Sequence, residues 1–415
     1  MNRRSFLQGT GALAGLGVLN GCAKHVASNN VAGAPTLPFY DLPGPIVPIR
    51  ADVDRIFRIT VCLRPFRAAG PRFDVEKVGS KTVVMNYGHG GSGWSLSWGS
   101  ADFAVRKAAE ALPGQREIAI IGAGALGLTA ALTAQRTGYA VTIYAKERGP
   151  YVRSARATGS WTPDSRIALA GNVPPAFGPA WESMARFSFG MYQSYLGAAG
   201  SPIEWTDRYS LSDDDPPPAK GSPRANAAGE VETGHDFIHL NSRIADLTPR
   251  NQMLPLGATP FPTKYVQRSS SLTFNVAGYS KQLMQEFQIA GGRIEAREFH
   301  APTDFAALPQ QLIVCCTGYG SRALWSDESI VPVRGQIAWL IPQESANYGI
   351  YYKRLNMLAR RDGIVIQPSV HGEEDGWNDT NEEPDRAEAE GGVRILQELY
   401  SRMKPPAGKP RNASV

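Results

Sequence analysis

Short apolar runs separated by turn residues divide the first part of the chain into predicted strands and helices. Residues 56–63 alternate apolar and polar side chains, which predicts a strand that stops at Arg64-Pro65. Next come a predicted strand and helix, at 81–87 and 101–112. A strand–helix–strand unit follows, made of a buried-type strand, the turn GAGALG, a helix and a second strand, at 117–121, 122–127, 128–137 and 140–144.

The second half of the chain continues the mixture of strands and helices without an internal repeat. Helical patterns fall at 276–290 and 385–403. Predicted strands fall at 292–297, 311–318, 333–341 and 363–368. Polar, Pro-rich residues at 211–234 indicate a surface loop, and residues 23–54, rich in Pro, Gly, Ala and Asn, indicate a tether.

Composition narrows the class of protein. The 415 residues favour two domains, and 42% hydrophobic with 20% charged residues is typical of a globular protein. The net charge of +5 is small and no polybasic run occurs, so we do not expect nucleic acid as a partner. Four cysteines do not make a disulfide framework, and the neighbours Cys315 and Cys316 are expected to pack within a strand.

The N-terminal residues 1–22 resemble a twin-arginine export signal. Arg3-Arg4 precede a Gly- and Ala-rich apolar stretch that is too short to span a bilayer as a permanent helix. The stretch ends at LNGC, which resembles a lipoprotein cleavage box with Cys22 as the lipidated residue. We therefore expect export by the twin-arginine route. The exported protein would be either periplasmic or a membrane-anchored lipoprotein. A terminus that contains two arginines by chance is the alternative.

The GAGALG turn has the context of a dinucleotide-binding loop, with a strand before it and a helix and strand after it. Gly122 permits the tight turn, Gly124 the close approach of a pyrophosphate, and Gly127 the packing of helix against strand. The helix N-terminus attracts negative charge. Glu147 is the candidate for binding a ribose hydroxyl, although Lys146 directly follows the strand. The alternative is a glycine-rich turn that serves only helix packing.

A second glycine motif precedes this loop. It is NYGHGGSGW at 86–94, with RPFR at 64–67 before it and SWG at 97–99 after it. Further short motifs are GSWTP, CTG, RGQ and GWN, at 159–163, 316–318, 334–336 and 376–378. Together these motifs resemble the D-amino-acid oxidase family of FAD enzymes. The resemblance covers most of residues 55–403, and it favours FAD, which the dinucleotide loop alone does not separate from NAD.

The resemblance implies an α/β fold with a Rossmann-like FAD-binding domain and an antiparallel-sheet α+β substrate domain. The FAD-binding domain is expected at 55–165 and 265–325, the substrate domain at 166–264 and 326–405, and a tail at 406–415. FAD contacts are expected from both glycine motifs and from the segment after the second strand. The implied cofactor residues are Gly90, Gly91, Ser92, Gly93, Trp94, Ser95, Gly122, Ala123, Gly124, Leu126, Gly127, Glu147, Ser154, Thr158, Gly159 and Gly318.

The order of the motifs differs from that family, in which the Arg-Pro and HGGSG block lies at the C-terminus. Here the block precedes the dinucleotide loop, and no second copy follows. A circular permutation explains this order, with the helix at 101–112 now joined to the strand at 117–121 through a short loop. Such a rearrangement is physically possible where the original termini lie near each other and the new ends are exposed.

Candidate catalytic residues also follow from the resemblance. Arg64 matches the arginine that holds the substrate carboxylate, a task suited to a bidentate and permanently charged guanidinium. The carbonyl of Gly91 matches the acceptor for the substrate amine. The helix that begins near Gly93 directs its N-terminus at the flavin, where a positive dipole favours acceptance of a hydride at N5.

The lid of that family carries two tyrosines four residues apart, and the match here is partial. Tyr352 matches the first, and Asn356 stands in place of the second. Tyr351 is the alternative if the register shifts by one residue, and strand packing is the alternative for both tyrosines. The missing phenol removes a carboxylate donor or changes the size of the pocket.

The expected activity is oxidation of the C–N bond of a D-amino acid or related amine carboxylate by hydride transfer to the flavin. The imine is then hydrolysed to a keto acid and ammonia, and oxygen yields hydrogen peroxide. Two alternatives stay open: an exported dehydrogenase of another substrate class that passes electrons to a quinone or carrier, and a flavin-binding scaffold without turnover. His89 is expected to be a hydrogen-bonded structural residue, and no cluster has the spacing of a metal site.

Overall fold

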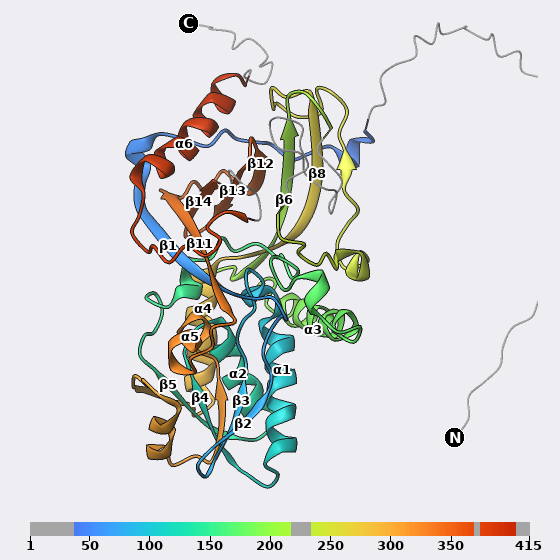
Figure 1. The fold of residues 1–415 in the computed structure, drawn as a ribbon. Coiled ribbons are helices and arrows are strands. Elements are labelled where there is room, and N and C mark those ends of the chain that lie inside the picture. The colour runs from blue at the N-terminus through green and yellow to red at the C-terminus, as the bar shows by residue number, and fades with distance from the viewer. Residues whose placement is uncertain (1–36, 217–233, 369–373, 404–415) are drawn as a thin grey trace, which may run out of the picture. The chain divides into compact units, whose positions relative to one another are not determined.

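The computed structural model describes residues 37–216, 234–368 and 374–403 (Figure 1). The expected export signal at 1–22, the first part of the expected tether and the tail at 406–415 lie outside the described residues. The described residues belong to one compact unit with two sheets, of six and eight strands. In Figure 1 the six-stranded sheet lies in the lower half and the eight-stranded sheet in the upper half.

The six-stranded sheet contains the predicted strand–helix–strand unit. Its strands run in the order β2-β3-β10-β4-β5-β9, and all neighbours are parallel except β2 and β3. The strands are β2 Val75–Val78, β3 Lys81–Met85, β4 Glu117–Ile121, β5 Ala140–Ala145, β9 Arg293–Ala296 and β10 Leu312–Cys315. Every residue of β3 and β10 is buried, as expected for parallel strands covered on both faces.

Four helices pack with one face of this sheet in a single apolar core. They are α1 Gly93–Ala111, α2 Ala125–Arg136, α3 Phe177–Gln193 and α4 Val276–Ile289. Gly99 allows α1 to approach α3 closely, because a Cβ at this position would collide with the backbone of Met184. The short helix α5, Ser321–Leu324, packs with the opposite face of the sheet.

Helices α1 and α2 both begin earlier than the apolar pattern predicts. Their first residues are Gly93 and Ala125 rather than residues 101 and 128. The first turns are rich in Gly, Ser and Ala, which give no helical periodicity, and tertiary contacts stabilise them instead. In α1, for example, the buried hydroxyl of Ser97 shares a hydrogen bond with that of Tyr192 at 2.9 Å.

The eight-stranded sheet has the order β1-β11-β14-β13-β12-β6-β8-β7 and is antiparallel except between β12 and β6. Its strands are β1 Ile56–Arg67, β6 Ile203–Ser212, β7 Gln252–Met253, β8 Tyr265–Phe274, β11 Ile330–Leu340, β12 Tyr348–Tyr352, β13 Leu355–Arg360 and β14 Gly363–Pro368. Helix α6, Arg386–Ser401, covers one face and closes a second apolar core.

Strand β1 differs from its prediction in length and in place. It does not stop at Arg64-Pro65 but continues to Arg67, and it pairs with β11 throughout. Residues 56–67 therefore belong to the eight-stranded sheet, which corrects their assignment to the FAD-binding domain. Proline is tolerated within the strand because β1 is an edge strand, where a missing N–H breaks fewer ladder hydrogen bonds.

Other segments also depart from the predicted division of the chain. Strand β8 lies in the eight-stranded sheet rather than with the FAD-binding residues, and α3 packs in the core of the six-stranded sheet. The expected tether is packed from about residue 46, because Ile49 and Ala51 are buried in the core beneath α6. Composition misses this packing because the few apolar anchors lie among many prolines and glycines.

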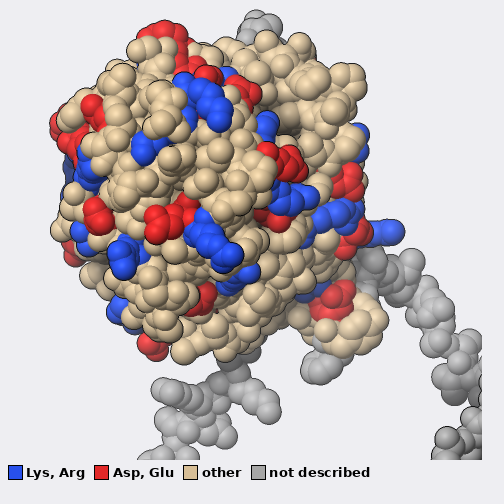
Figure 2. All heavy atoms as spheres, turned by 90° about the horizontal axis from the view of Figure 1, so that it is seen from below, with Lys and Arg blue, Asp and Glu red and all other residues tan. Residues whose placement is uncertain are grey.

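The surface shows no strong segregation of charge on the side that Figure 2 presents, where Lys and Arg side chains alternate with Asp and Glu. Within the described ranges, no helix is both long and apolar enough to cross a lipid bilayer. The same ranges contain no group of three or more His, Cys, Asp or Glu side chains arranged to hold a metal ion.

Candidate active site

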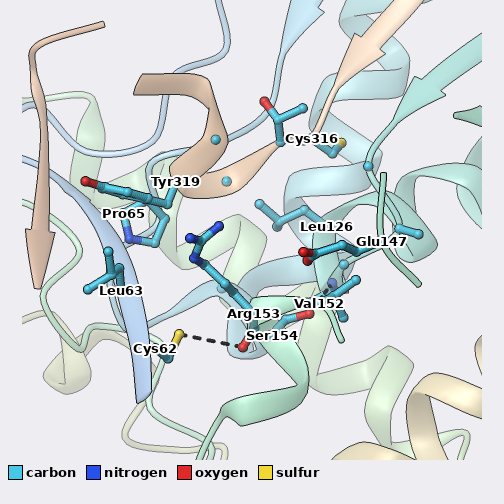
Figure 3. A pocket seen from close by; sticks show the side chains of 18 of the residues that line it. Cys62, Leu63, Pro65, Leu126, Glu147, Val152, Arg153, Ser154, Cys316 and Tyr319 are labelled. Carbon is cyan, nitrogen blue, oxygen red and sulfur yellow. Dashed lines mark hydrogen bonds between the residues drawn. The ribbon is translucent and has the colours of Figure 1, made fainter. Parts of the chain in front are cut away.

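A cavity of about 580 Å³ is lined by residues of both sheets. Its wall is formed by the carboxyl ends of β4, β5 and β10, by the first turns of α1 and α2, and by parts of β1 and β11. The carboxyl ends of parallel strands are the place where open α/β sheets bind ligands. The volume lies in the range of cofactor and small-molecule sites. Figure 3 shows the cavity from close by.

The GAGALG turn forms one wall of the cavity. Gly122 has a φ of +107°, and a Cβ there would lie 2.6 Å from the carbonyl oxygen of Cys316. Gly127 lies behind the wall, where a Cβ would collide with the carbonyl of Gly122. The turn therefore requires glycine for the conformation and for the packing of α2 on the sheet, as the sequence predicts.

The HGGSG motif forms the wall next to it. Gly90 has a φ of +53°, and a Cβ would collide with the carbonyl oxygen of Arg166. At Gly91 a Cβ would lie 2.6 Å from the hydroxyl oxygen of Ser165. The motif is thus pressed against the segment at 165–166, and its backbone, free of side chains, lines the cavity where α1 begins.

Glu147 lines the cavity just beyond the end of β5, and Figure 3 shows its side chain among the lining residues. Lys146, which precedes it, pairs with Glu298 at 2.7 Å. The lysine is thus engaged in an ion pair with the segment that follows β9. Glu147 thus lies at the cavity, and its contact with a ribose hydroxyl stays a prediction.

Arg64 lies on β1 and lines the cavity. Its Nη1 donates hydrogen bonds to the carbonyls of Arg334 at 3.0 Å and Val333 at 3.5 Å. A Cβ on Gly335 would collide with the guanidinium, so the glycine on β11 leaves room for it. Burial lowers the pKa of Arg64, while Cys62 and Asp375 oppose that shift. The group remains a guanidinium at neutral pH, held by backbone carbonyls and directed at the cavity wall.

Most of the predicted site residues line the cavity. Those that line it are Arg64, Gly90, Gly91, Gly93, Trp94, Gly122, Ala123, Gly124, Leu126, Glu147, Ser154, Thr158 and Gly318. The predicted cofactor residues that are not part of the lining are Ser92, Ser95, Gly127 and Gly159. Two of these bind neighbouring segments: Ser92 Oγ donates to the carbonyl of Ser165 at 3.0 Å, and Ser95 Oγ accepts from the N–H of Thr162 at 2.8 Å.

The structure does not bring Tyr352 to the cavity, in contrast to the predicted lid role. Its ring is buried in the core beneath α6, and its hydroxyl donates to Asp213 at 2.6 Å and accepts from Arg402. Tyr351 points to the other face of the sheet, because side chains alternate along a strand, and there it is the register partner of Asn356. Neither Tyr351 nor Asn356 is among the described residues that line the cavity.

Several residues that line the cavity belong to no sequence motif and were therefore not predicted as site residues. Arg153 and Arg156 follow β5 and place two guanidinium groups at the cavity, and Cys62 and Tyr319 face them. Two arginines in the loop after a Rossmann strand are the only signal that could have drawn attention to them. Whether these arginines reach the cavity depends on the direction of their side chains, which the sequence does not specify.

His89 is buried within the glycine motif, and its Nε2 shares a hydrogen bond with Ser100 Oγ at 2.7 Å. Burial lowers the pKa of His89 to about 3, so the imidazole is neutral at ordinary pH. This environment suits a structural residue that supports the turn, and it does not suit a group that exchanges protons near neutral pH.

The buried imidazole makes a prediction about stability. The unfolded chain binds a proton at this side chain below about pH 6.5, whereas the folded chain binds it only near pH 3. The free energy of unfolding therefore falls as the pH is lowered between these values, by at most about 1.4 kcal/mol per pH unit from this group. In urea unfolding experiments between pH 7 and pH 4, the free energy of unfolding of His89→Gln should fall less steeply with decreasing pH than that of the wild type. Parallel curves would contradict the assignment, and His239→Gln at an exposed position is the matched control.

Comparison with known proteins agrees with this geometry. The family model DAO, described as FAD dependent oxidoreductase, matches residues 117–412. The D-amino-acid oxidase of Streptomyces coelicolor is 25% identical over 287 residues, which cover 66% of this chain and 75% of that protein. The D-amino acid oxidase of Dugesia ryukyuensis is 26% identical over 143 residues, 33% of this chain and 41% of that protein.

Among solved structures, the L-amino acid deaminase from Proteus vulgaris matches with a TM-score of 0.42 and 13% sequence identity. This match covers 62% of the present chain and 61% of the deaminase, so it spans about three fifths of the length of that protein. The family match is the more extensive finding, because it runs from β4 to beyond α6 and takes in most of the chain. The chain therefore belongs to the DAO family of FAD-dependent oxidoreductases.

Proposed function

We propose that this protein oxidises the C–N bond of a D-amino acid or a related amine carboxylate. The observation that supports this most is that Arg64 lines the same cavity as both glycine motifs. A guanidinium at a cofactor cavity can hold a carboxylate by paired hydrogen bonds. The extent of the match to a protein named D-amino-acid oxidase, 66% of the present chain, supports the same substrate class.

FAD is the cofactor of the family, and the described residues fit it. The turn at Gly122 and Gly124 leads into the N-terminus of α2 at the cavity, and a helix N-terminus suits a diphosphate. Glu147 would accept from a ribose hydroxyl, and the bare backbone at Gly90 and Gly91 would lie against the flavin ring. Bound FAD supplies a two-electron acceptor for the α-hydrogen of a substrate.

The residues of the chain position the substrate rather than exchange protons with it. Arg64 takes the carboxylate, and the carbonyl of Gly91 accepts a hydrogen bond from the amine, so that the α-carbon is held between them. The two carboxylates among the described lining residues, Glu147 and Glu298, follow β5 and β9, and Asp375, whose charge acts on the pKa of Arg64, is not part of the lining. We propose that the amine is oxidised in its neutral form and that water hydrolyses the resulting imine to a keto acid and ammonia.

The activity is tested with the purified, flavin-loaded protein and matched panels of D- and L-amino acids. We expect D-amino acids to bleach the flavin absorbance without oxygen, and to yield one keto acid per peroxide formed in air. Bleaching without peroxide, together with reduction of an artificial dye, would instead identify a dehydrogenase that uses another acceptor. Absence of flavin bands, or bleaching by neither panel, would contradict the proposal.

Variants on one strand test the role of Arg64 in the same assay. Arg64→Met should raise KM for the amino acid about 10- to 100-fold, because a charge-assisted carboxylate pair is lost. Arg58→Met removes the same group from an exposed position on β1 outside the cavity and should leave KM unchanged. Equal kinetics of the two variants would place the carboxylate site elsewhere.

We also propose that the chain is a circular permutant of the order implied by the family resemblance. The family match begins at residue 117, after the HGGSG block, although that block lines the same cavity. The loop from α1 to β4 spans only residues 112–116. At the other junction α6 lies against the segment before β1, since Gln397 Nε2 donates to Asp52 at 3.3 Å and Arg386 Nη2 to the carbonyl of Val53 at 3.4 Å.

A reordered chain tests this relationship. It would start at residue 117, join residue 403 to residue 46 by a short flexible linker, and end at residue 114. Because both junctions are close in space, we expect it to fold and to bind FAD with an unchanged visible spectrum. Failure to bind flavin by a chain that folds, judged by circular dichroism, would argue that the present order is required.

Export by the twin-arginine route is a further part of the proposed function. The pattern around Arg3 and Arg4 and the LNGC stretch at 19–22 support it. Replacing both arginines by lysine should abolish export while the flavin content of the retained protein stays unchanged, as measured in cell fractions. Normal export of the double variant would contradict this route, and Cys22→Ala separates lipid attachment from export.

A further inference from the structure

Arg153 begins the turn that follows β5, at 153–156, and this turn lies against the start of α2. The hydroxyl oxygen of Ser154 accepts a hydrogen bond from the N–H of Ala125, the first residue of α2, at 3.0 Å. A Cβ on Gly124 would lie 3.2 Å from the same oxygen. The backbone of Arg153 is therefore next to the helix N-terminus at which a dinucleotide diphosphate binds.

The side chain of Arg153 extends into the cavity rather than away from it. In Figure 3 it rises into the middle of the view, with Pro65 and Tyr319 on one side and Leu126 and Glu147 on the other. The guanidinium carbon lies 5.4 Å from the centroid of the Tyr319 ring, a cation–π distance. Arg153 thus spans the space between the start of α2 and the turn after β10.

The hydrogen bonds of Arg153 leave part of its guanidinium unused. Nη2 donates to Glu382 at 2.5 Å, and the other oxygen of Glu382 lies 3.6 Å from Arg156. One carboxylate is thus shared between two guanidinium groups, which leaves a net positive charge. Nε of Arg153 is buried and has no hydrogen-bond partner among the described residues. A buried N–H without an acceptor is unfavourable and indicates an acceptor that the chain itself does not provide.

We propose that Arg153 binds the diphosphate of FAD as a side-chain cation, with Glu382 as the positioning residue that holds the guanidinium through Nη2. The backbone at this loop offers less than a helix start usually does, because the N–H of Ala125 is already bonded to Ser154. A helix N-terminus is equivalent to about half a positive charge, whereas a diphosphate carries about two negative charges. A fork of N–H donors suits phosphate oxygens, and Nε belongs to that fork. The inference rests on FAD as the cofactor and not on the identity of the substrate.

The test measures ligand affinity of the flavin-free protein, with FAD, ADP and riboflavin as separate probes. ADP carries the diphosphate without the flavin, and riboflavin carries the flavin without phosphate. Arg153→Gln should weaken FAD and ADP binding about 10- to 100-fold and leave riboflavin binding unchanged, because only the charge-assisted phosphate contact is lost. Arg153→Lys should recover part of the loss. Arg148→Gln, an exposed arginine of the same loop outside the cavity lining, should bind all three probes like the wild type.

Each other outcome overturns the assignment. Equal losses for ADP and riboflavin would mean that Arg153 supports the shape of the cavity rather than the diphosphate. Unchanged ADP affinity would leave Arg153 as an ion-pair partner of Glu382 alone. If Arg153→Gln does not fold, the wild type and Arg153→Lys are compared instead, by measuring ADP affinity at increasing salt concentration. Both proteins retain the positive charge, so their ADP affinities should fall in parallel as salt is raised. Salt-independent binding by both would contradict a cationic site. None of these binding measurements requires turnover, so their outcome can be distinguished from a failure of the proposed oxidation.

Discussion

The contact between α1 and α2 determines where the site forms. The two helices share one core, and Thr129 Oγ1 on α2 donates to the carbonyl of Ser97 on α1 at 3.0 Å. Each helix begins at a glycine motif, and the strands that precede them, β3 and β4, are both neighbours of β10. Two helix N-termini and the carboxyl ends of β4, β5 and β10 therefore open onto one cavity, and the positive ends of both helices lie at the same space.

Local patterns predict the six-stranded sheet well, because its buried parallel strands are short apolar runs bounded by glycine. The same patterns do not reveal which sheet a strand joins. The alternation at 56–63 predicts a strand, but its pairing with β11 depends on residues 330–340, far along the chain. In α1 and α2, first turns made of small residues hide the true start of each helix, because tertiary packing and not periodicity stabilises them.

In the candidate site, too, the sequence predicts some features and does not predict others. Backbone requirements are visible in the sequence, so Gly90, Gly91, Gly122 and Gly124 are found where a cofactor loop needs them. Side-chain direction is not visible. Tyr352 differs from Tyr351 by one position, and alternation along β12 sends its phenol to Asp213 and Arg402, away from the cavity. Arg64 consequently lines the cavity without the two tyrosines expected of a lid.

The pairing of β1 has a consequence for how the protein is made. Arg64 and the carbonyl of Val333 that accepts its hydrogen bond are 269 residues apart in the chain, and β11 is the only strand neighbour of β1 among the described residues. Loop closure over such a separation is slow, so β1 stays unpaired until residues 330–340 have left the ribosome. A chain that ends before residue 330 lacks β11, so Arg64 has none of the backbone carbonyls that hold its guanidinium. The wall of the cavity that β1 and β11 form can therefore be completed only late in synthesis, after about four fifths of the 415 residues have been made.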